Sequence, residues 1–187
     1  MVIRIITYGY TKEEGFAKAQ KVANDLCDEK RLSFDYAQDF KSKGSKMSGS
    51  GRWGKKPYCV LADSKQGKNL IDDGLHNQKV SFSEKLDEMK DYLEYTNDEL
   101  FEGEIIEDKS KVLDRLNQRV LNLDMFRYYC SCLGQYYGSE IFLYNCDGEG
   151  IRNKRELKRA LDKYDNGVDV VTQSGEKVWV SPFDVHF

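Results

Sequence analysis

The stretch VIRIITY at residues 2–8 constrains the fold most, because it is a run of β-branched and aromatic residues broken only by Arg4. Such a run is typical of a strand buried on both faces. Thr11 and Glu14 follow at the spacing of a capping box, T-x-x-E, which marks a helix N-terminus. Apolar residues then recur at helical spacing: Phe16, Ala19, Ala23 and Leu26. The sequence therefore predicts a strand followed by a helix over residues 2–29.

The next part of the chain alternates between loop and regular structure. Residues 31–37, RLSFDYA, are compatible with a short strand, and residues 57–63, PYCVLAD, predict a second strand that we expect parallel to the first. The glycine-, serine- and lysine-rich segment between them predicts a flexible loop. Ser81 and Glu84 form another capping box, which predicts that a helix begins there.

The C-terminal half carries a similar mixture of elements. Apolar residues at helical spacing predict a long amphipathic helix through residues 113–130. Residues 140–145, EIFLYN, predict a strand, and residues 157–164 predict a helix that ends at Gly167. Residues 168–183 predict a hairpin with its turn near Ser174, Gly175 and Glu176.

These elements predict an α+β, or mixed α/β, fold. It comprises an N-terminal strand–helix unit, a long central amphipathic helix and a C-terminal strand, helix and hairpin. An acidic segment near residue 100 is the best candidate boundary, so we expect an N-terminal α/β lobe over 1–99 and a C-terminal α+β lobe over 100–187. A single continuous domain remains the alternative, since 187 residues are enough for one core.

Composition restricts the expected cellular location of the protein. It contains no run of eighteen apolar residues and no signal-peptide pattern at its start, so we expect a cytoplasmic protein without membrane contact. The five cysteines are an odd number without a C-x-x-C pair, which predicts reduced, mostly buried thiols. We expect neither a cofactor nor a metal site.

Charge is strongly segregated along the chain. Residues 41–56 hold six basic residues and no acid, and residues 94–108 hold seven acids and no base. A second basic cluster lies in residues 151–163, IRNKRELKRALDK. Such segregation favours nucleic acid or a nucleic-acid-binding protein as the partner, although each run alone is also compatible with a solvated surface.

The candidate binding residues come from these runs. Lysine and arginine contact phosphates, and an aromatic face stacks on an unpaired base. The candidates for nucleic-acid binding are Lys46, Arg52, Trp53, Lys55, Lys56, Lys154, Arg155, Lys158 and Arg159. Tyr58 is a further aromatic residue available for stacking. The candidates for partner binding are Glu94, Asp98, Glu99, Glu102 and Glu104.

The segment GSGRWG at residues 49–54 matches the spacing G-x-G-x-x-G of dinucleotide-binding loops. A pyrophosphate loop needs a strand directly before the glycines and a helix N-terminus directly after them. Here a polar segment precedes the glycines, and Pro57 and an expected strand follow them. A basic nucleic-acid contact or a solvated loop therefore fits this segment better than a dinucleotide site.

The candidates for catalysis are the two histidines, His76 and His186. Imidazoles titrate near neutral pH, so a pair of them can act as general base and general acid in RNA cleavage. Neither lies in a supporting motif, and surface or packed histidines are far commoner. An RNA-directed nuclease or phosphodiesterase remains the alternative to a binding protein.

Two segments carry a resemblance to known proteins. MVIRIITYGYTKEEGFAKAQKVANDL and EIFLYNCDGEGIRNKRELKRAL resemble, in general character, the small accessory proteins of Gram-positive phages and mobile elements, above all the anti-CRISPR proteins that inhibit type II-A Cas9. The resemblance contains no defining motif and transfers no functional residue. It implies a protein that binds Cas9 with its guide RNA in the cytoplasm of the host bacterial cell. A plain nucleic-acid-binding accessory protein is a further hypothesis.

The acidic segment generates a prediction about association. Replacement of Glu99, Glu102 and Glu104 with glutamine is expected to slow binding to a type II-A Cas9–guide RNA complex, because opposite charge steers diffusional encounter. The association rate measured by stopped-flow at low salt tests this, with high salt as the screened control. An unchanged association rate at low salt would show that the acidic segment is only a solvated surface.

Overall fold

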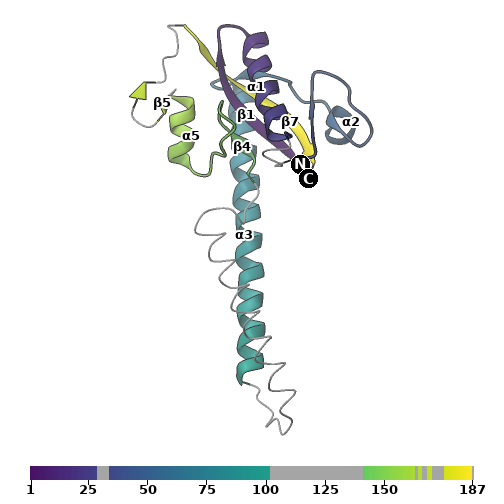
Figure 1. The fold of residues 1–187 in the computed structure, drawn as a ribbon, viewed down its shortest axis with the longest axis vertical. Helices are drawn as coiled ribbons and strands as arrows, with labels where there is room; N and C mark the ends of the chain where they lie inside the picture. Colours follow the sequence, from purple (N-terminus) through teal and green to yellow (C-terminus); the bar gives the residue numbers. More distant parts are fainter. Residues whose placement is uncertain (29–33, 102–140, 163, 166–167, 170–174, 187) are drawn as a thin grey trace. The chain divides into compact units, whose positions relative to one another are not determined.

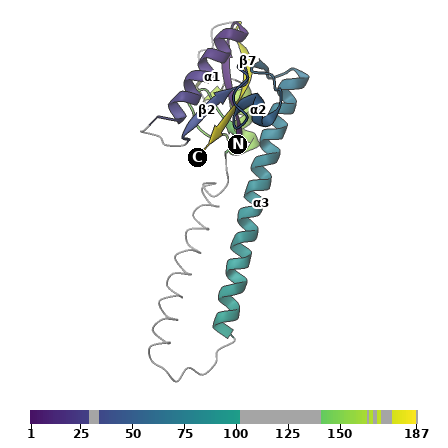
Figure 2. The same ribbon diagram turned by 90° about the vertical axis from the view of Figure 1, so that its right-hand side faces the viewer.

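The structure is a computed structural model, which describes residues 1–28, 34–101, 141–162, 164–165, 168–169 and 175–186. These residues form helices and a mixed sheet, which confirms the α+β fold (Figures 1 and 2). The chain divides into two compact units. The first comprises Met1–Asn77 with Ile141–Phe187, and the second comprises Gln78–Glu140.

The sheet of the first unit is organised around one long C-terminal strand, β7 (Lys177–His186). It pairs antiparallel with β1 (Val2–Gly9) over the whole length of β1, from Val2 opposite Asp184 to Gly9 opposite Lys177. The short strands β2 (Tyr36–Asp39) and β3 (Val60–Leu61) also pair antiparallel with β7. On the other side of β1, β4 (Leu143–Tyr144) is parallel to it.

Every residue of β1 is buried, as the apolar run predicts. Successive side chains of a strand point to opposite faces of the sheet. Ile3 and Ile5 accordingly pack in the core with α1 (Lys12–Leu26), whereas Ile6 belongs to a second core on the other face. That second core includes Leu70 and Ile71 of α3 (Lys65–Phe101) together with Leu157 and Ala160 of α5 (Lys154–Leu161).

The N-terminal strand and helix are confirmed, including the capping box. The Thr11 hydroxyl accepts a hydrogen bond from the Glu14 backbone N–H at 3.2 Å. The Glu14 carboxylate accepts one from the Tyr10 backbone N–H at 2.9 Å. The first bond satisfies a donor that an α-helix leaves free at its start, and the second ties the residue before the N-cap to the first turn. The bond from Tyr10 and the ammonium of Lys18 lower the pKa of Glu14.

Two expectations for the segment after the loop are corrected. The strand expected at 57–63 is shortened to Val60–Leu61. It pairs antiparallel with β7, as β1 does, so it runs in the same direction as β1, as expected, but is separated from it by β7. The chain turns directly after Leu61, because the Ser64 hydroxyl donates to the Leu61 carbonyl at 2.6 Å and accepts from the Gly67 N–H at 3.0 Å. Helix α3 therefore begins at Lys65, and Ser81 lies within it instead of capping it.

The C-terminal elements are confirmed in part. β4 lies within the expected strand, and α5 is the expected helix, capped by the Asn153 side chain and ending before Asp162. The expected hairpin in 168–183 is wrong, since β6 (Val168–Asp169) pairs with β5 (Tyr164–Asp165) while β7 pairs with β1, β2 and β3. The two-sided burial of β7 suits a central strand. The expected helix through 113–130 and Gly167 lie outside the described residues.

The two units have different limits from the lobes 1–99 and 100–187 that the acidic segment suggests. The physical reason is strand pairing, because β1 is hydrogen-bonded to both β4 and β7 and so joins the two ends of the chain in one sheet. None of the helices formed by the described residues is both long and apolar enough to cross a membrane.

The close packing of α1 on β7 generates a prediction. A Cβ atom at Gly15 would lie 2.5 Å from Cδ1 of Trp179, which is too close for any real contact. Gly15→Ala is therefore expected to destabilise the fold by about 1–3 kcal/mol through overpacking, although alanine normally favours a helix interior. Urea denaturation measures this, with the exposed Gln20→Ala as the control. Equal or higher stability of Gly15→Ala would contradict the packing.

Candidate functional site

The basic loop, residues 41–56, is the first candidate site and is more ordered than its composition suggests. The GSGRWG segment forms the short helix α2 (Gly49–Trp53). Gly49 has a φ of +55°, and a Cβ atom at Gly51 would lie 1.8 Å from the Ser45 carbonyl oxygen. The glycines thus allow the loop to fold tightly on itself. Their spacing is explained without a bound phosphate, and five residues of the expected loop are helical.

Asp184 of β7 holds this loop against the sheet. Its carboxylate is fully buried and accepts a hydrogen bond from the Gly49 backbone N–H at 2.8 Å and from the Trp53 indole Nε1–H at 2.7 Å. The amino group of Met1 lies 3.9 Å from the same carboxylate. A buried carboxylate is tolerated only with such partners, so the loop and the strand depend on each other.

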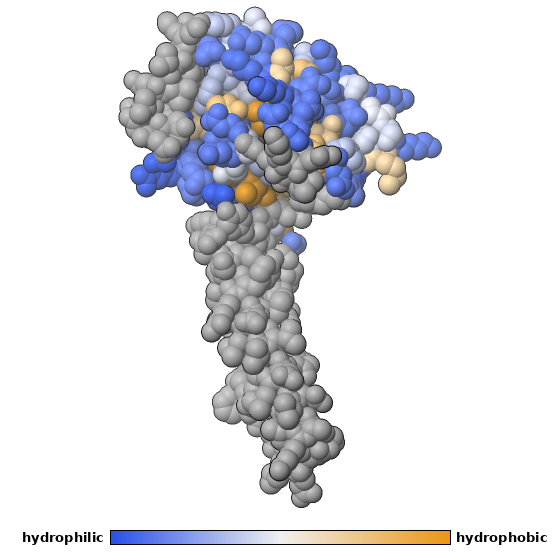
Figure 3. All heavy atoms as spheres, in the orientation of Figure 1, coloured by the Kyte–Doolittle hydropathy of each residue, from blue (hydrophilic) through white to orange (hydrophobic). Residues whose placement is uncertain are grey.

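The cations of the loop lie on its outer surface. Lys46, Arg52 and Lys55 are exposed and Lys56 is half-buried. The remaining lysines of the loop, Lys41 and Lys43, are also exposed, and within the described residues none of these six cations has an acidic partner within 4.0 Å. Figure 3 shows a largely hydrophilic surface on the side where Figure 1 places α2. The loop therefore presents unneutralised positive charge from a fixed position.

The two aromatic residues of this region have different surroundings. Trp53 is 41% exposed, and the Arg52 guanidinium lies over its ring, 4.9 Å from the centroid. Tyr58 is half-buried and meets the edge of Phe16, with the Lys12 ammonium 3.9 Å from its ring centroid. The structure therefore leaves Trp53 as the accessible ring and uses Tyr58 in packing.

The second basic cluster lies on α5, away from the loop. Leu157 and Ala160 are buried, while Lys154, Arg155 and Lys158 are exposed and Arg159 is half-buried. In the view of Figure 1, α5 lies to the left and α2 to the right, with strands of the sheet between them. The sequence-predicted cations thus form two separate surfaces.

The structure describes no side chain of the acidic candidates. Glu94, Asp98 and Glu99 belong to the final turns of α3, where only the backbone is described. Glu102 and Glu104 lie outside the described residues. Their assignment to partner binding stays a prediction.

The two histidines lie on different elements. His186 ends β7, where its ring stacks on Tyr36 and its Nδ1 lies 3.6 Å from an Asp35 carboxylate oxygen. His76 is an exposed residue of α3. Within the described residues no hydrogen bond or ring contact joins them, so the structure gives no support to an acid–base pair made of both.

The three cysteines of the described residues, Cys27, Cys59 and Cys146, are free thiols. Of these only Cys59 is fully buried, so the expectation of mostly buried thiols is too strong for this part of the chain. Burial raises the pKa of both the Cys59 and the Cys27 thiols. Both are therefore protonated at neutral pH and are poor nucleophiles. Cys130 and Cys132 lie outside the described residues.

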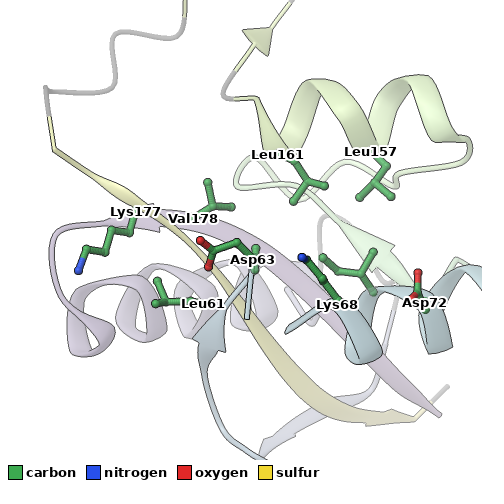
Figure 4. A pocket seen from close by; sticks show the side chains of 10 residues that line it. Leu61, Asp63, Lys68, Asp72, Leu157, Leu161, Lys177 and Val178 are labelled. Carbon is green, nitrogen blue, oxygen red and sulfur yellow. The ribbon is translucent and has the colours of Figure 1, made fainter. Parts of the chain in front are cut away.

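A pocket of about 790 Å³, which sequence reasoning missed, lies between α5, the β3–α3 connection and the start of β7 (Figure 4). Figure 4 shows Leu157 and Leu161 extending from α5 toward the side chains of Asp63 and Lys68. The walls are mainly aliphatic, and the charged lining residues are Asp63, Lys68, Asp72 and Lys177. The volume is that of a small-molecule site, and the lining suits an amphiphile with an aliphatic body. Its residues come from three segments that are distant in the sequence, 61–72, 157–161 and 177–178, so no local pattern indicates it.

Comparison with known proteins places the chain in a family. A model described as a domain of unknown function, DUF7995, matches residues 1–187. The chain belongs to the DUF7995 family. No curated protein and no solved structure matches it. The basic loop and its Asp184 anchor are therefore the features of this DUF7995 chain that bear most directly on function.

The anchor generates a prediction about stability. Asp184→Ala removes the acceptor of the Gly49 and Trp53 hydrogen bonds. The expected cost is roughly 2–6 kcal/mol, since each buried group left without its partner costs about 1–3 kcal/mol. Denaturant unfolding measures the loss, and the indole N–H signal of Trp53 in an NMR spectrum reports its release. Trp53→Phe is the matched control, because it removes one donor and leaves the carboxylate bonded to Gly49. Equal stability of the two variants would contradict the anchor.

Proposed function

We propose that this DUF7995 protein binds RNA through the basic loop and inhibits a nucleoprotein complex, with type II-A Cas9 and its guide RNA as the proposed target. The observation that carries the proposal is the attachment of the loop to Asp184. A cationic loop held in place binds a polyanion at a lower entropic cost than one that must first be ordered.

The local charge balance supports phosphate binding. The loop contains no acid, and the nearest acid in sequence, Asp39, accepts hydrogen bonds at 2.9 Å from the backbone N–H groups of Lys41 and Ser42. That carboxylate therefore caps the start of the loop. The exposed ammonium groups and the guanidinium of Arg52 remain available for phosphate oxygens, which they contact without reading base sequence.

The choice of Cas9 rests on the resemblance of residues 1–26 and 140–161 to anti-CRISPR proteins. The charge layout supports it in two ways. Basic surfaces on the loop and on α5 suit the phosphates of a guide RNA, and the acidic run suits a protein surface that normally receives DNA. The loop is the proposed main RNA contact, and α5 is a second, separate one.

One experiment separates inhibition from catalysis. End-labelled guide RNA, free and loaded on a type II-A Cas9, is incubated with the protein and run on a denaturing gel, while target-DNA cleavage is measured in parallel. Intact guide with blocked cleavage is the expected result. Shortened guide would instead support the alternative, an RNA-directed nuclease, and unchanged guide and cleavage would contradict Cas9 as the target.

The loop generates a prediction about salt dependence. Replacing Arg52, Lys55 and Lys56 with glutamine is expected to weaken RNA binding and to reduce the slope of log K against log salt by roughly 2, at about 0.7 per phosphate contact on a single strand. Fluorescence anisotropy with a labelled RNA measures both quantities.

The matched control is the triple glutamine variant of Lys21, Lys65 and Lys177, which are exposed and lie outside the loop. It removes the same net charge, so it tests whether position matters beyond total charge. If the slope of log K against log salt fell equally in both variants, the loop would not be the RNA-binding site.

A further inference from the structure

Trp53 is hydrogen-bonded to a buried group and yet stays partly exposed, unlike a tryptophan of the core. The protein has two tryptophans. Trp179 is 8% exposed and donates its indole N–H to the Gly9 carbonyl at 2.9 Å, so it is part of the core. Trp53 also has its N–H bonded to a buried acceptor, but 41% of the residue remains accessible. Its polar edge is thus directed inward while the residue stays partly accessible to solvent.

The Trp53 ring is oriented by its hydrogen bond to Asp184 of β7. The Asp184 carboxylate bonds the Trp53 indole with one oxygen and the Gly49 N–H with the other, so both ends of α2 are held to β7. An exposed tryptophan in an unconstrained loop loses side-chain and backbone freedom when it stacks on a ligand. Trp53 has lost much of that freedom before any ligand arrives.

The surroundings of the ring select the ligand. The Arg52 guanidinium lies 4.9 Å from the Trp53 ring centroid, and Lys55 and Lys56 follow in the chain. Indole and guanidinium planes both stack on nucleobases, and neighbouring cations contact the phosphates of the same strand. A duplex hides the faces of its bases in its own stack, so only an unpaired base can use this surface.

We infer that Trp53 is a stacking platform for an unpaired nucleobase, so that the ligand of the basic loop is single-stranded nucleic acid, RNA or DNA, in preference to a duplex. The inference rests on the proposed binding function of the loop and adds the strand form that it selects. Tyr58 takes no part, because its ring is engaged by Phe16 and Lys12.

The test uses the full chain and three labelled probes: a ten-nucleotide oligo-U, the matching oligo-dT and a blunt duplex. Affinity is measured by fluorescence anisotropy, and stacking is measured as quenching of tryptophan emission with unlabelled probes. The expected result is tighter binding and quenching with the single strands. Trp53→Leu is expected to weaken single-strand binding by roughly 5- to 150-fold, the range of one stacked base, and to abolish the quenching.

Trp53→Phe is the matched control, because it keeps an aromatic face and loses the hydrogen bond to Asp184. It is expected to retain more single-strand affinity than Trp53→Leu. Trp179 remains in both variants and gives the unquenched core signal. Comparison of oligo-U with oligo-dT separates an RNA ligand from a DNA ligand.

The outcomes separate this inference from the function on which it rests. The stacking platform would be overturned if the protein bound single strand and duplex equally, if its tryptophan emission were not quenched, and if Trp53→Leu left the affinity unchanged. The phosphate-binding loop would remain intact in that case. Absence of binding to all three probes would overturn both. Loss of duplex and single-strand binding alike in Trp53→Leu would show a general defect of the loop and also overturn the platform.

Discussion

The antiparallel pairing of β1 with β7 is the interaction on which the rest of the first unit depends. Residues 2–9 and residues 177–184 form this pair, and every other strand of the sheet is attached to one of its two members. Both cores also form on it, since Ile5 of β1 packs on the α1 face and Val180 of β7 packs on the opposite face. The basic loop is attached to the same pair through Asp184.

Local patterns in the sequence predict local structure well. The apolar run and capping box of residues 2–14 specify β1 and the start of α1, because both signals act within a few residues. The same reasoning fails for β7, whose pattern fits a hairpin strand but whose partner lies at the other end of the chain. It also fails at Ser81, where a valid capping pattern lies inside a helix that Ser64 has already started.

The candidate site was likewise predictable from the sequence only where the signal is local. Composition alone identifies the cations of the loop, because a run of basic residues without acids can be recognised from the sequence without knowledge of tertiary contacts. It gives no information on which ring stays exposed, because that depends on contacts with distant residues: Asp184 for Trp53, and Phe16 and Lys12 for Tyr58. A single acid in the apolar strand VWVSPFDVH is the one signal that could have indicated Asp184.

The separation of Gly49 and Asp184 by 135 positions has a consequence for how the protein is made. Synthesis proceeds from the N-terminus, and contacts between distant residues form slowly because a long loop must close first. Until residue 184 has left the ribosome, the loop has no carboxylate to hold it and β1 has no main partner. The nascent chain therefore exposes a cationic segment together with the edge of β1 that later pairs with β7, and both are secured in one late step.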